Sequence, residues 1–271
     1  MKINLVIAHA LEAKCLIQQF AMQQRNESPL IYENTQGMRL IVCGEGAQCA
    51  ADGVNVLHAH SDGETRAWLN LGIAGHQSLA LGQCFVANKI VNRVSKEVAY
   101  PAPMNHGQAV GELHTVVEPE LSYPDDVGYD MEAYPFFETA TGNSTLELVQ
   151  VFKIISDNKA HDARKISKAD IIESFQQNRE AIVATLECLE QSRALYEQSQ
   201  FVPKDFQLIE SSVHLTATRR AQVYRLCQRL TALGLEARLR SITDSAAAKN
   251  IDGKKLVDEL SQVLVQHEAA I

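Results

Sequence analysis

Carboxylates stand at several points where apolar runs of the sequence end. Asp130 and Glu132 flank a methionine in "GYDMEAY", Glu12 follows the first apolar run, and Asp157 ends the run "KIISD". Burial of an ionised carboxylate without partners is costly, so each acid needs solvent, or a hydroxyl or ammonium group beside it. If Glu12, Glu132 and Asp157 converge on one cleft, they can serve as a base, an acid and a ligand for neighbouring hydroxyl groups.

Each of these acids also has a simpler interpretation. Glu12 can be an acid of a first helical turn, which the helix dipole favours, and Asp157 can be a helix N-cap. Asp130 and Glu132 can be solvated side chains. The residue types alone leave both interpretations open for all four acids.

Short turns follow three of the apolar runs, at the strand ends where open α/β sheets bind their ligands. These turns lie within "AHALEA" (8–13), "GEGAQCAA" (44–51) and "NLGIAGH" (70–76). The Gly-x-Gly of the second turn is a weak match to a dinucleotide fingerprint, because the third glycine is missing. Glu45 stands between the two glycines and would repel a pyrophosphate.

Composition excludes several classes of protein. The chain has 271 residues, of which 46% are hydrophobic, and its formal net charge is −8. That acidic balance argues against a nucleic-acid partner, which needs a clustered basic face. No run is long and apolar enough for a membrane span, and no signal peptide is evident. A soluble, cytoplasmic protein with no membrane partner is expected.

No metal or organic cofactor is expected. The six cysteines form no Cys-x-x-Cys pair, so they are predicted to be reduced thiols. His58 and His60 lie two residues apart on a predicted helix and therefore point to different faces, which disfavours a zinc site.

Alternating strands and helices predict an α/β fold, a three-layer α/β/α sandwich around a mixed, partly closed sheet. Segment 93–127 is weakly patterned, with one plausible strand at 111–119. Strands are predicted at 2–8, 67–75, 83–91 and 146–157, a hairpin at 30–46, and helices at 11–24, 47–60, 131–142 and 167–198.

The pattern changes near Val202 and Pro203. Residues 1–199 are predicted to form the α/β domain, and residues 200–271 a helical C-terminal appendage. Two amphipathic helices are expected in the appendage, near 216–233 and 252–267.

Five stretches, taken in order, resemble the nucleoside phosphorylase/nucleosidase superfamily, and most closely its 5′-methylthioadenosine/S-adenosylhomocysteine nucleosidase branch. "AHALEA" is similar to the Ala-Met-x-x-Glu-Val opening of that branch, and "GEGAQCAADGVNVL" to its Gly-Ile-Gly-Lys-x-x-Ala-Ala segment. "LNLGIAGHQSLALGQCFVANKIV" is similar to Asn-Thr-Gly-Ser-Ala-Gly-Gly … Gly-Asp-Ile-Val-Val, "DMEAY" to the Met-Glu motif, and "KIISDN" to Arg-Ala-Ile-Ser-Asp. The resemblance covers about residues 1–190, and five motifs in the right order are fairly specific.

The resemblance implies a role for each matching residue. Glu132 would bind the ribose 2′- and 3′-hydroxyls and stabilise the oxocarbenium-like charge that develops as the N-glycosidic bond breaks. Asp157 would protonate or hydrogen-bond N7 of the departing purine, and Glu12 would orient or deprotonate the attacking water. The other substrate-binding positions are Met131, Ser156, Gly75 and Ala74, with Glu45, Asp130 and His9 as additional candidates.

The expected activity is hydrolysis of the N-glycosidic bond of a purine nucleoside that can be 5′-modified. Phosphorylases of the family hold phosphate with arginines at the strand exits, and here those exits contain no arginine. Hydrolysis is therefore favoured over the alternative, a phosphorylase that uses inorganic phosphate.

A second alternative is a nucleoside-binding protein that keeps the fold and has lost turnover. In support of it, Ile73 replaces a serine of the family pattern and the adenine-binding Ser-Gly-Asp-x-Phe segment is missing, whereas the three retained acids argue against it. Two further departures from the family pattern are His76 in place of a glycine and Lys153 in place of an arginine. Families of this fold usually assemble as homo-oligomers, so a dimer or larger assembly is expected.

Overall fold

The computed structural model of the chain describes residues 1–25, 30–61, 63–105, 107–199, 202–249 and 251–268. The chain forms two compact units, Met1–Glu197 and Gln198–Ile271. Among the helices of the described residues, none combines the length and the apolar character that a bilayer span requires.

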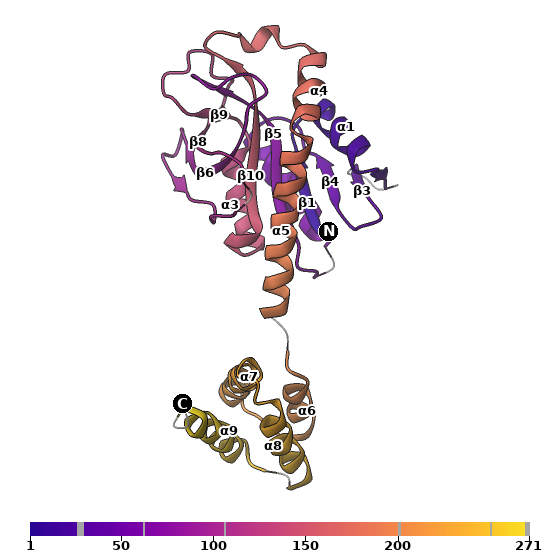
Figure 1. Cartoon of the computed structure of the whole chain (residues 1–271), viewed down its shortest axis with the longest axis vertical. Coiled ribbons are helices and arrows are strands. Elements are labelled where there is room, and N and C mark those ends of the chain that lie inside the picture. Colours follow the sequence, from indigo (N-terminus) through magenta and orange to yellow (C-terminus); the bar gives the residue numbers. More distant parts are fainter. Residues whose placement is uncertain (26–29, 62, 106, 200–201, 250, 269–271) are drawn as a thin grey trace. The chain divides into compact units, whose positions relative to one another are not determined.

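One mixed sheet of ten described strands forms the centre of the first unit (Figure 1). Neighbours follow the order β10-β6-β8-β9-β5-β1-β4-β3-β2, with β7 paired to β6. The strands are β1 (Ile3–Ile7), β2 (Gln23–Gln24), β3 (Ile31–Glu33), β4 (Arg39–Val42), β5 (Ala67–His76), β6 (Cys84–Asn92), β7 (Val98–Ala99), β8 (Val110–Thr115), β9 (Gly128–Asp130) and β10 (Val149–Asn158).

Part of this sheet closes on itself, because β5 pairs with both ends of the series β10-β6-β8-β9. Strand β10 follows one edge of β5 from Trp68 to His76. On the other edge, β1 pairs with β5 as far as Asn70, and β9 pairs only with Gly75 and His76. In the described pairing, residues 71–74 therefore have no strand on that edge. The candidate active site described below forms at this interruption of the strand pairing along β5.

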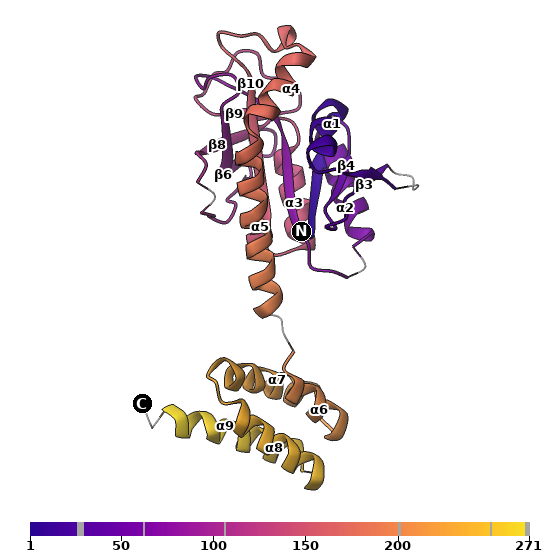
Figure 2. The same cartoon turned by 45° about the vertical axis from the view of Figure 1, so that its right-hand side comes forward.

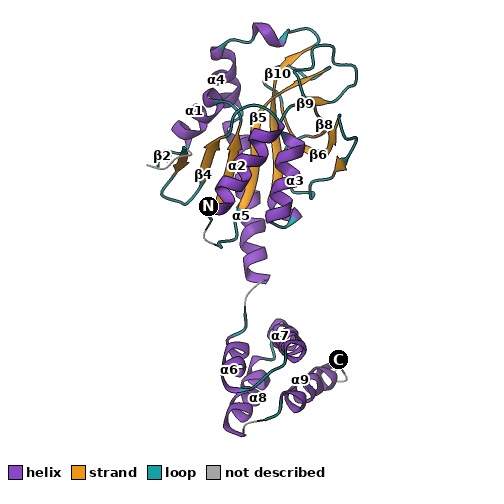
Figure 3. Cartoon of the chain, turned by 180° about the vertical axis from the view of Figure 1, so that it is seen from behind, coloured by secondary structure: helices purple, strands orange, loops and turns teal. Residues whose placement is uncertain are grey.

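Helices cover both faces of the sheet, so the predicted α/β/α sandwich is confirmed. On one face, α2 (Ala47–Ala59) and α3 (Ala133–Asn143) pack on one hydrophobic cluster, and Figure 3 shows both in front of the strands. On the other face lie α1 (Ala10–Gln19), α4 (Lys168–Gln177) and α5 (Arg179–Ser199), with a second cluster (Figure 2). Burial on both sides explains why the central strands are continuous apolar runs.

Two predicted helices end earlier than expected. The helix predicted over 11–24 stops at Gln19, since Ala21 adopts a left-handed conformation with φ 49° and β2 follows. The helix predicted over 167–198 is two helices, α4 and α5, separated at Asn178. The Asn178 amide donates to the Gly82 carbonyl at 2.7 Å and so ties this break to the sheet. Asn commonly ends helices because its side chain competes for backbone hydrogen bonds.

The second unit contains four described helices rather than the two predicted. They are α6 (Lys204–Ser212), α7 (Ala217–Ala232), α8 (Glu236–Lys249) and α9 (Gly253–Glu268). The segment expected to separate two helices itself forms α8. Leu239 and Ala246 of α8 are fully buried in a core with Leu230, Leu256 and Leu260. A few apolar residues among many polar ones gave α8 a weak helical pattern.

Each unit has its own hydrophobic core, so each is expected to fold alone. A chain that ends at Ser199 should unfold cooperatively, with a midpoint within about 4 °C of the first-unit transition of the full chain, a shift equal to about 1 kcal/mol at this size. A chain of residues 202–271 should be helical by circular dichroism. A shortened chain without a cooperative thermal transition would contradict the expectation.

Candidate active site

A pocket of about 250 Å³ opens where β5 lies between β1 and β9. We call it the acid pocket. Every predicted site residue except Glu12 lines it, namely His9, Glu45, Ala74, Gly75, Asp130, Met131, Glu132, Ser156 and Asp157. Residues from five separate stretches of the chain therefore meet in one place.

Glu12 lies behind the wall of this pocket, in the first turn of α1, and is 1% exposed. Its carboxylate takes the place of a strand beside β5. The Ile73 backbone N–H donates to Oε1 at 2.8 Å, and the His9 N–H donates to Oε2 at 3.1 Å. Gly72 allows this approach, because a Cβ there would lie 3.1 Å from Oε1. Burial raises the pKa of Glu12, although His9 and the Ile73 hydrogen bond oppose the shift.

Glu132 precedes α3 and is 7% exposed. Its Oε1 accepts the Gly46 backbone N–H at 2.7 Å, and no other described group bonds to Oε2. Gly46 has φ 93° and begins α2, so the Gly-x-Gly turn aims a helix N-terminus at this carboxylate rather than at a phosphate. Burial, followed by the charge of Asp130, raises the pKa of Glu132.

Asp130 is fully engaged by the protein. Its Oδ2 accepts from Lys153 Nζ at 2.9 Å and from the Ala133 N–H at 2.8 Å, and its Oδ1 accepts from Thr115 Oγ1 at 2.8 Å. Thr115 in turn accepts the Tyr134 N–H at 3.0 Å. Asp130 therefore anchors the start of α3, and its position fixes that of Glu132.

Lys153 is the cation at the centre of these acids, with a side chain that is 2% exposed. Burial by itself would lower its pKa, but the charges of Asp130 and Glu132 and the hydrogen bond to Asp130 raise it. The ammonium form therefore persists at neutral pH. The charge of Lys153 lowers the pKa of both Glu12 and Glu132 and so opposes the effect of burial on them.

Asp157 lies near the end of β10, and its carboxylate accepts hydrogen bonds from two hydroxyl groups. Ser156 Oγ donates to Oδ1 at 2.5 Å, and the Tyr123 hydroxyl donates to Oδ2. The register between β10 and β5 shifts between Ile155 and Asp157, and such a bulge re-aims a side chain. A Cβ at Gly75 would lie 2.5 Å from Asp157 Oδ2, so glycine is required there.

Tyr123 is the functional residue that the sequence did not reveal. It is 2% exposed, and it lies in the weakly patterned segment 93–127, beyond the one strand predicted there at 111–119. The Gln77 amide donates to the Tyr123 carbonyl at 2.8 Å and holds this loop against β5. Burial, followed by the bond to Asp157, raises the pKa of Tyr123, so its hydroxyl stays a donor. A buried tyrosine before proline gave no spacing signal that could have identified it.

His9 and Glu45 flank the solvent-exposed side of the acid pocket. His9 Nδ1 lies 3.4 Å from Glu45 Oε1, and their side chains are 43% and 62% exposed. Ala74 and Met131 contribute apolar wall between the acids. No lysine or arginine of the described residues lines the pocket. Nor do three or more His, Cys, Asp or Glu side chains in the described parts of the chain gather to hold a metal ion.

Comparison with solved structures found several similar folds. The MTA/SAH nucleosidase of Streptococcus pneumoniae in complex with 8-aminoadenine is 20% identical with a TM-score of 0.56, over 69% of this chain and 100% of that one. The futalosine hydrolase of Helicobacter pylori strain 26695 is 13% identical with a TM-score of 0.57, over 69% and 97%. Apo 5′-methylthioadenosine nucleosidase of Arabidopsis thaliana is 17% identical with a TM-score of 0.51, over 72% and 94%.

A scan against protein-family models and a search of curated proteins found no match. At these identities the likeness to solved structures concerns the fold. It confirms the nucleoside phosphorylase/nucleosidase fold that the five sequence motifs predicted.

Glu132→Gln should gain stability relative to the wild type as pH rises. A raised carboxyl pKa means that the folded wild type is favoured while Glu132 is protonated and loses stability above the unfolded value of 4.5, as the buried group ionises. Glutamine keeps the Oε1 acceptor for Gly46 and does not titrate. Urea unfolding at pH 5, 6.5 and 8 should show a growing difference, whereas exposed Glu138→Gln on the same helix should show none. A difference in the free energy of unfolding that does not change with pH would contradict the raised pKa of Glu132.

Lys153→Met should destabilise the first unit by about 3–5 kcal/mol, because it leaves Asp130 buried without its cation. The double variant Asp130→Asn/Lys153→Met should recover part of that loss. Lys89→Met is the matched control, since Lys89 Nζ also lies 3.0 Å from a carboxylate, that of Glu112, but both are about one-third exposed. The control should cost about 1 kcal/mol or less in urea unfolding. Equal losses of unfolding free energy for Lys153→Met and Lys89→Met would show that the buried ion pair contributes no more to stability than the exposed one.

Proposed function

We propose that this protein hydrolyses the N-glycosidic bond of a purine nucleoside. The observation that carries the proposal is the meeting of Glu132 and Asp157 in one pocket, with Glu12 directly behind its wall. Three carboxylates held at fixed positions can bind a sugar, hold a leaving base and handle a water proton. The similar folds belong to nucleosidases and a futalosine hydrolase, which supports the same class of reaction.

Glu132 is the ribose ligand in this proposal. No donor among the described residues bonds to its Oε2, and a carboxylate oxygen can accept more than one hydroxyl group. The 2′- and 3′-hydroxyls of a ribose would supply the partners that this buried oxygen lacks. Its negative charge would also stabilise the positive charge that develops on the sugar as the bond breaks.

Asp157 is the residue that meets the departing base. A protonated Asp157 would give its proton to purine N7, which converts the base into a neutral leaving group. Ser156 and Tyr123 donate to the carboxylate that remains, so their hydrogen bonds strengthen as the proton leaves. Interactions that are stronger in the transition state than in the ground state accelerate the reaction.

Water is the proposed nucleophile, with Glu12 as the group that receives its proton. Each Glu12 oxygen already accepts one backbone N–H but has a further lone pair. Its raised pKa makes it a stronger base than an ordinary glutamate. A phosphorylase would need cations for phosphate on the sugar side, and the described lining of the acid pocket offers neither lysine nor arginine.

Base release from a nucleoside panel tests the proposal. Pure protein would be incubated with methylthioadenosine, S-adenosylhomocysteine, adenosine, inosine and guanosine, each with and without phosphate, and free base measured by chromatography. Release without phosphate is expected. Release only with phosphate would establish a phosphorylase instead, and binding without release would establish a nucleoside-binding protein.

Asp157→Asn should lower kcat by about 100-fold or more, which is the usual contribution of a positioned general acid, while nucleoside binding is retained. Exposed Asp52 on α2, whose carboxylate accepts the Gln48 amide at 2.9 Å, provides the matched Asp52→Asn control and should leave kcat unchanged. Turnover of Asp157→Asn at the wild-type rate would remove Asp157 from the mechanism.

A further inference from the structure

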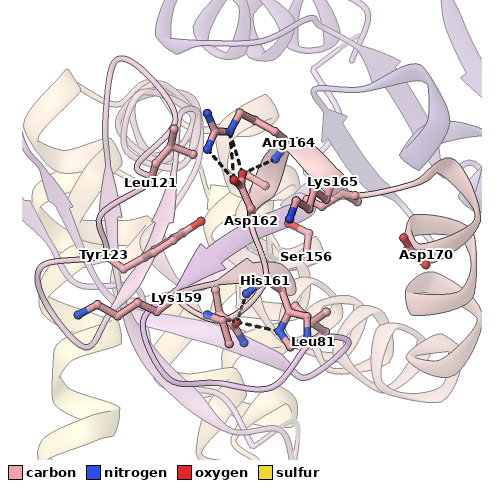
Figure 4. A pocket seen from close by; sticks show the side chains of 14 residues that line it. Leu81, Leu121, Tyr123, Ser156, Lys159, His161, Asp162, Arg164, Lys165 and Asp170 are labelled. Carbon is pink, nitrogen blue, oxygen red and sulfur yellow. Dashed lines mark hydrogen bonds and ion pairs between the residues drawn. The ribbon is translucent and has the colours of Figure 1, made fainter.

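A second cavity of about 560 Å³ adjoins the acid pocket. We call it the annex. Its walls are the loop 158–166 together with Leu81, Leu121, Tyr123 and Asp170 (Figure 4). Ser156, Ala163 and Ile166 line both cavities, so the two are continuous at these residues. The acid pocket alone is smaller than the ~300–1,000 Å³ usual for a ligand site, whereas the annex more than doubles the space beside it.

Basic side chains outnumber acidic ones on the lining of the annex, with Lys159, Arg164 and Lys165 against Asp162 and Asp170. Lys159 and Lys165 line it, and neither forms an ion pair or a side-chain hydrogen bond with another described residue. Its two acids are already engaged. Asp162 Oδ2 accepts from Arg164 Nη2 at 2.6 Å, and Asp170 Oδ2 accepts the Ser167 N–H at 2.8 Å. The charge of Lys165 contributes to lowering the pKa of Asp162. Neither ammonium group is bound by a carboxylate of the described residues, so both remain available to an anionic ligand, next to a pocket whose own charged groups are acidic.

Apolar side chains also line the annex. Leu81 and Leu121 line the annex while 44% and 48% exposed, and Ile166 lies at its junction with the acid pocket. The walls therefore suit a ligand group with an apolar stem and an anionic end.

The position of the annex relative to Asp157 identifies which part of a nucleoside would enter it. Ser156 and Tyr123, the two donors to Asp157, both line the annex. In a purine, N7 and the substituent on C6 lie on the same edge of the ring. A base that presents N7 to Asp157 therefore directs its 6-substituent past Ser156 and Tyr123 toward the annex.

We propose that the annex binds a carboxylate-bearing substituent on the 6-position of the purine, and that such 6-substituted purine nucleosides are the preferred substrates. This inference rests on the proposed function. A phosphate ion that acts as the nucleophile is a different case, because it must approach the sugar from the face opposite the base, whereas the annex lies on the side of the base.

Discrimination among matched nucleosides tests the inference. The probes are adenosine, N6-butyladenosine with an apolar substituent, N6-succinyladenosine with a carboxylate substituent, and adenosine 5′-carboxylate with the anion on the sugar. Discrimination is measured as kcat/KM where base is released, and as Kd by calorimetry where it is not. N6-succinyladenosine is expected to be preferred over N6-butyladenosine by about 10-fold or more, as for charge-assisted hydrogen bonds in a partly exposed site.

The variant Lys159→Gln/Lys165→Gln should remove that preference and leave adenosine within about two-fold of the wild type, since adenosine has no group for the annex. Lys14→Gln/Lys255→Gln removes the same charge from exposed positions outside both cavities and should change neither value. Equal discrimination in the lysine variant, or a preference for the 5′-carboxylate, would overturn the inference. Hydrolysis of adenosine without a preference for N6-succinyladenosine would overturn the role proposed for the annex but not the proposed function. Lysine-dependent binding of N6-succinyladenosine without any hydrolysis would support the role of the annex and overturn the proposed function.

Discussion

A lysine ammonium and an aspartate carboxylate, both removed from water, form the ion pair on which the rest of the site depends. Lys153 projects from β10 and Asp130 ends β9, so their contact joins the two strands that flank β5. A buried pair of this kind adds little net stability compared with apolar packing, but the loss of one partner is expensive. Its effect here is positional, because the same Asp130 carboxylate holds the first turn of α3 and thereby places Glu132.

The carboxylates of Glu12 and Glu132 lie at backbone N–H groups that no described β-strand pairs with. Glu12 accepts the Ile73 N–H that no strand reaches, and Glu132 accepts the Gly46 N–H at the start of a helix. Each acid satisfies a backbone donor that would otherwise be orphaned, and each backbone donor partly offsets the cost of burying the acid. Both groups nevertheless keep raised pKa values, so the folded protein stores unfavourable electrostatics at the site. A site that reduces stability in this way is common where function requires strained or buried charged groups.

The sequence predicted the central strands and the sandwich because these follow from apolar runs, and its motifs at strand ends named Glu132 and Asp157, which both line the acid pocket. It did not predict β9, whose three residues are too few to show a period, or the break between α4 and α5 at Asn178. The simpler interpretations of the acids proved partly true, since Glu12 does bond to its own helix start. Tyr123 could not be found, because its role depends on a loop whose position is fixed by contacts from β5 that are distant in sequence.

Under the proposed function, the division of charge between the two cavities would allow the pocket to bind a base without the family segment that holds adenine. The Ser-Gly-Asp-x-Phe segment that holds adenine in the family is missing, and residues 116, 119 and 120 stand at the acid pocket in its place. Opposite them the loop 158–166 leaves open space instead of closing over a bare purine. An enclosed adenine site derives its specificity from contacts with the edge of the purine ring. An open site must derive its specificity from a substituent that the ring carries. Lys159 and Lys165 are the charged groups placed to read that extension.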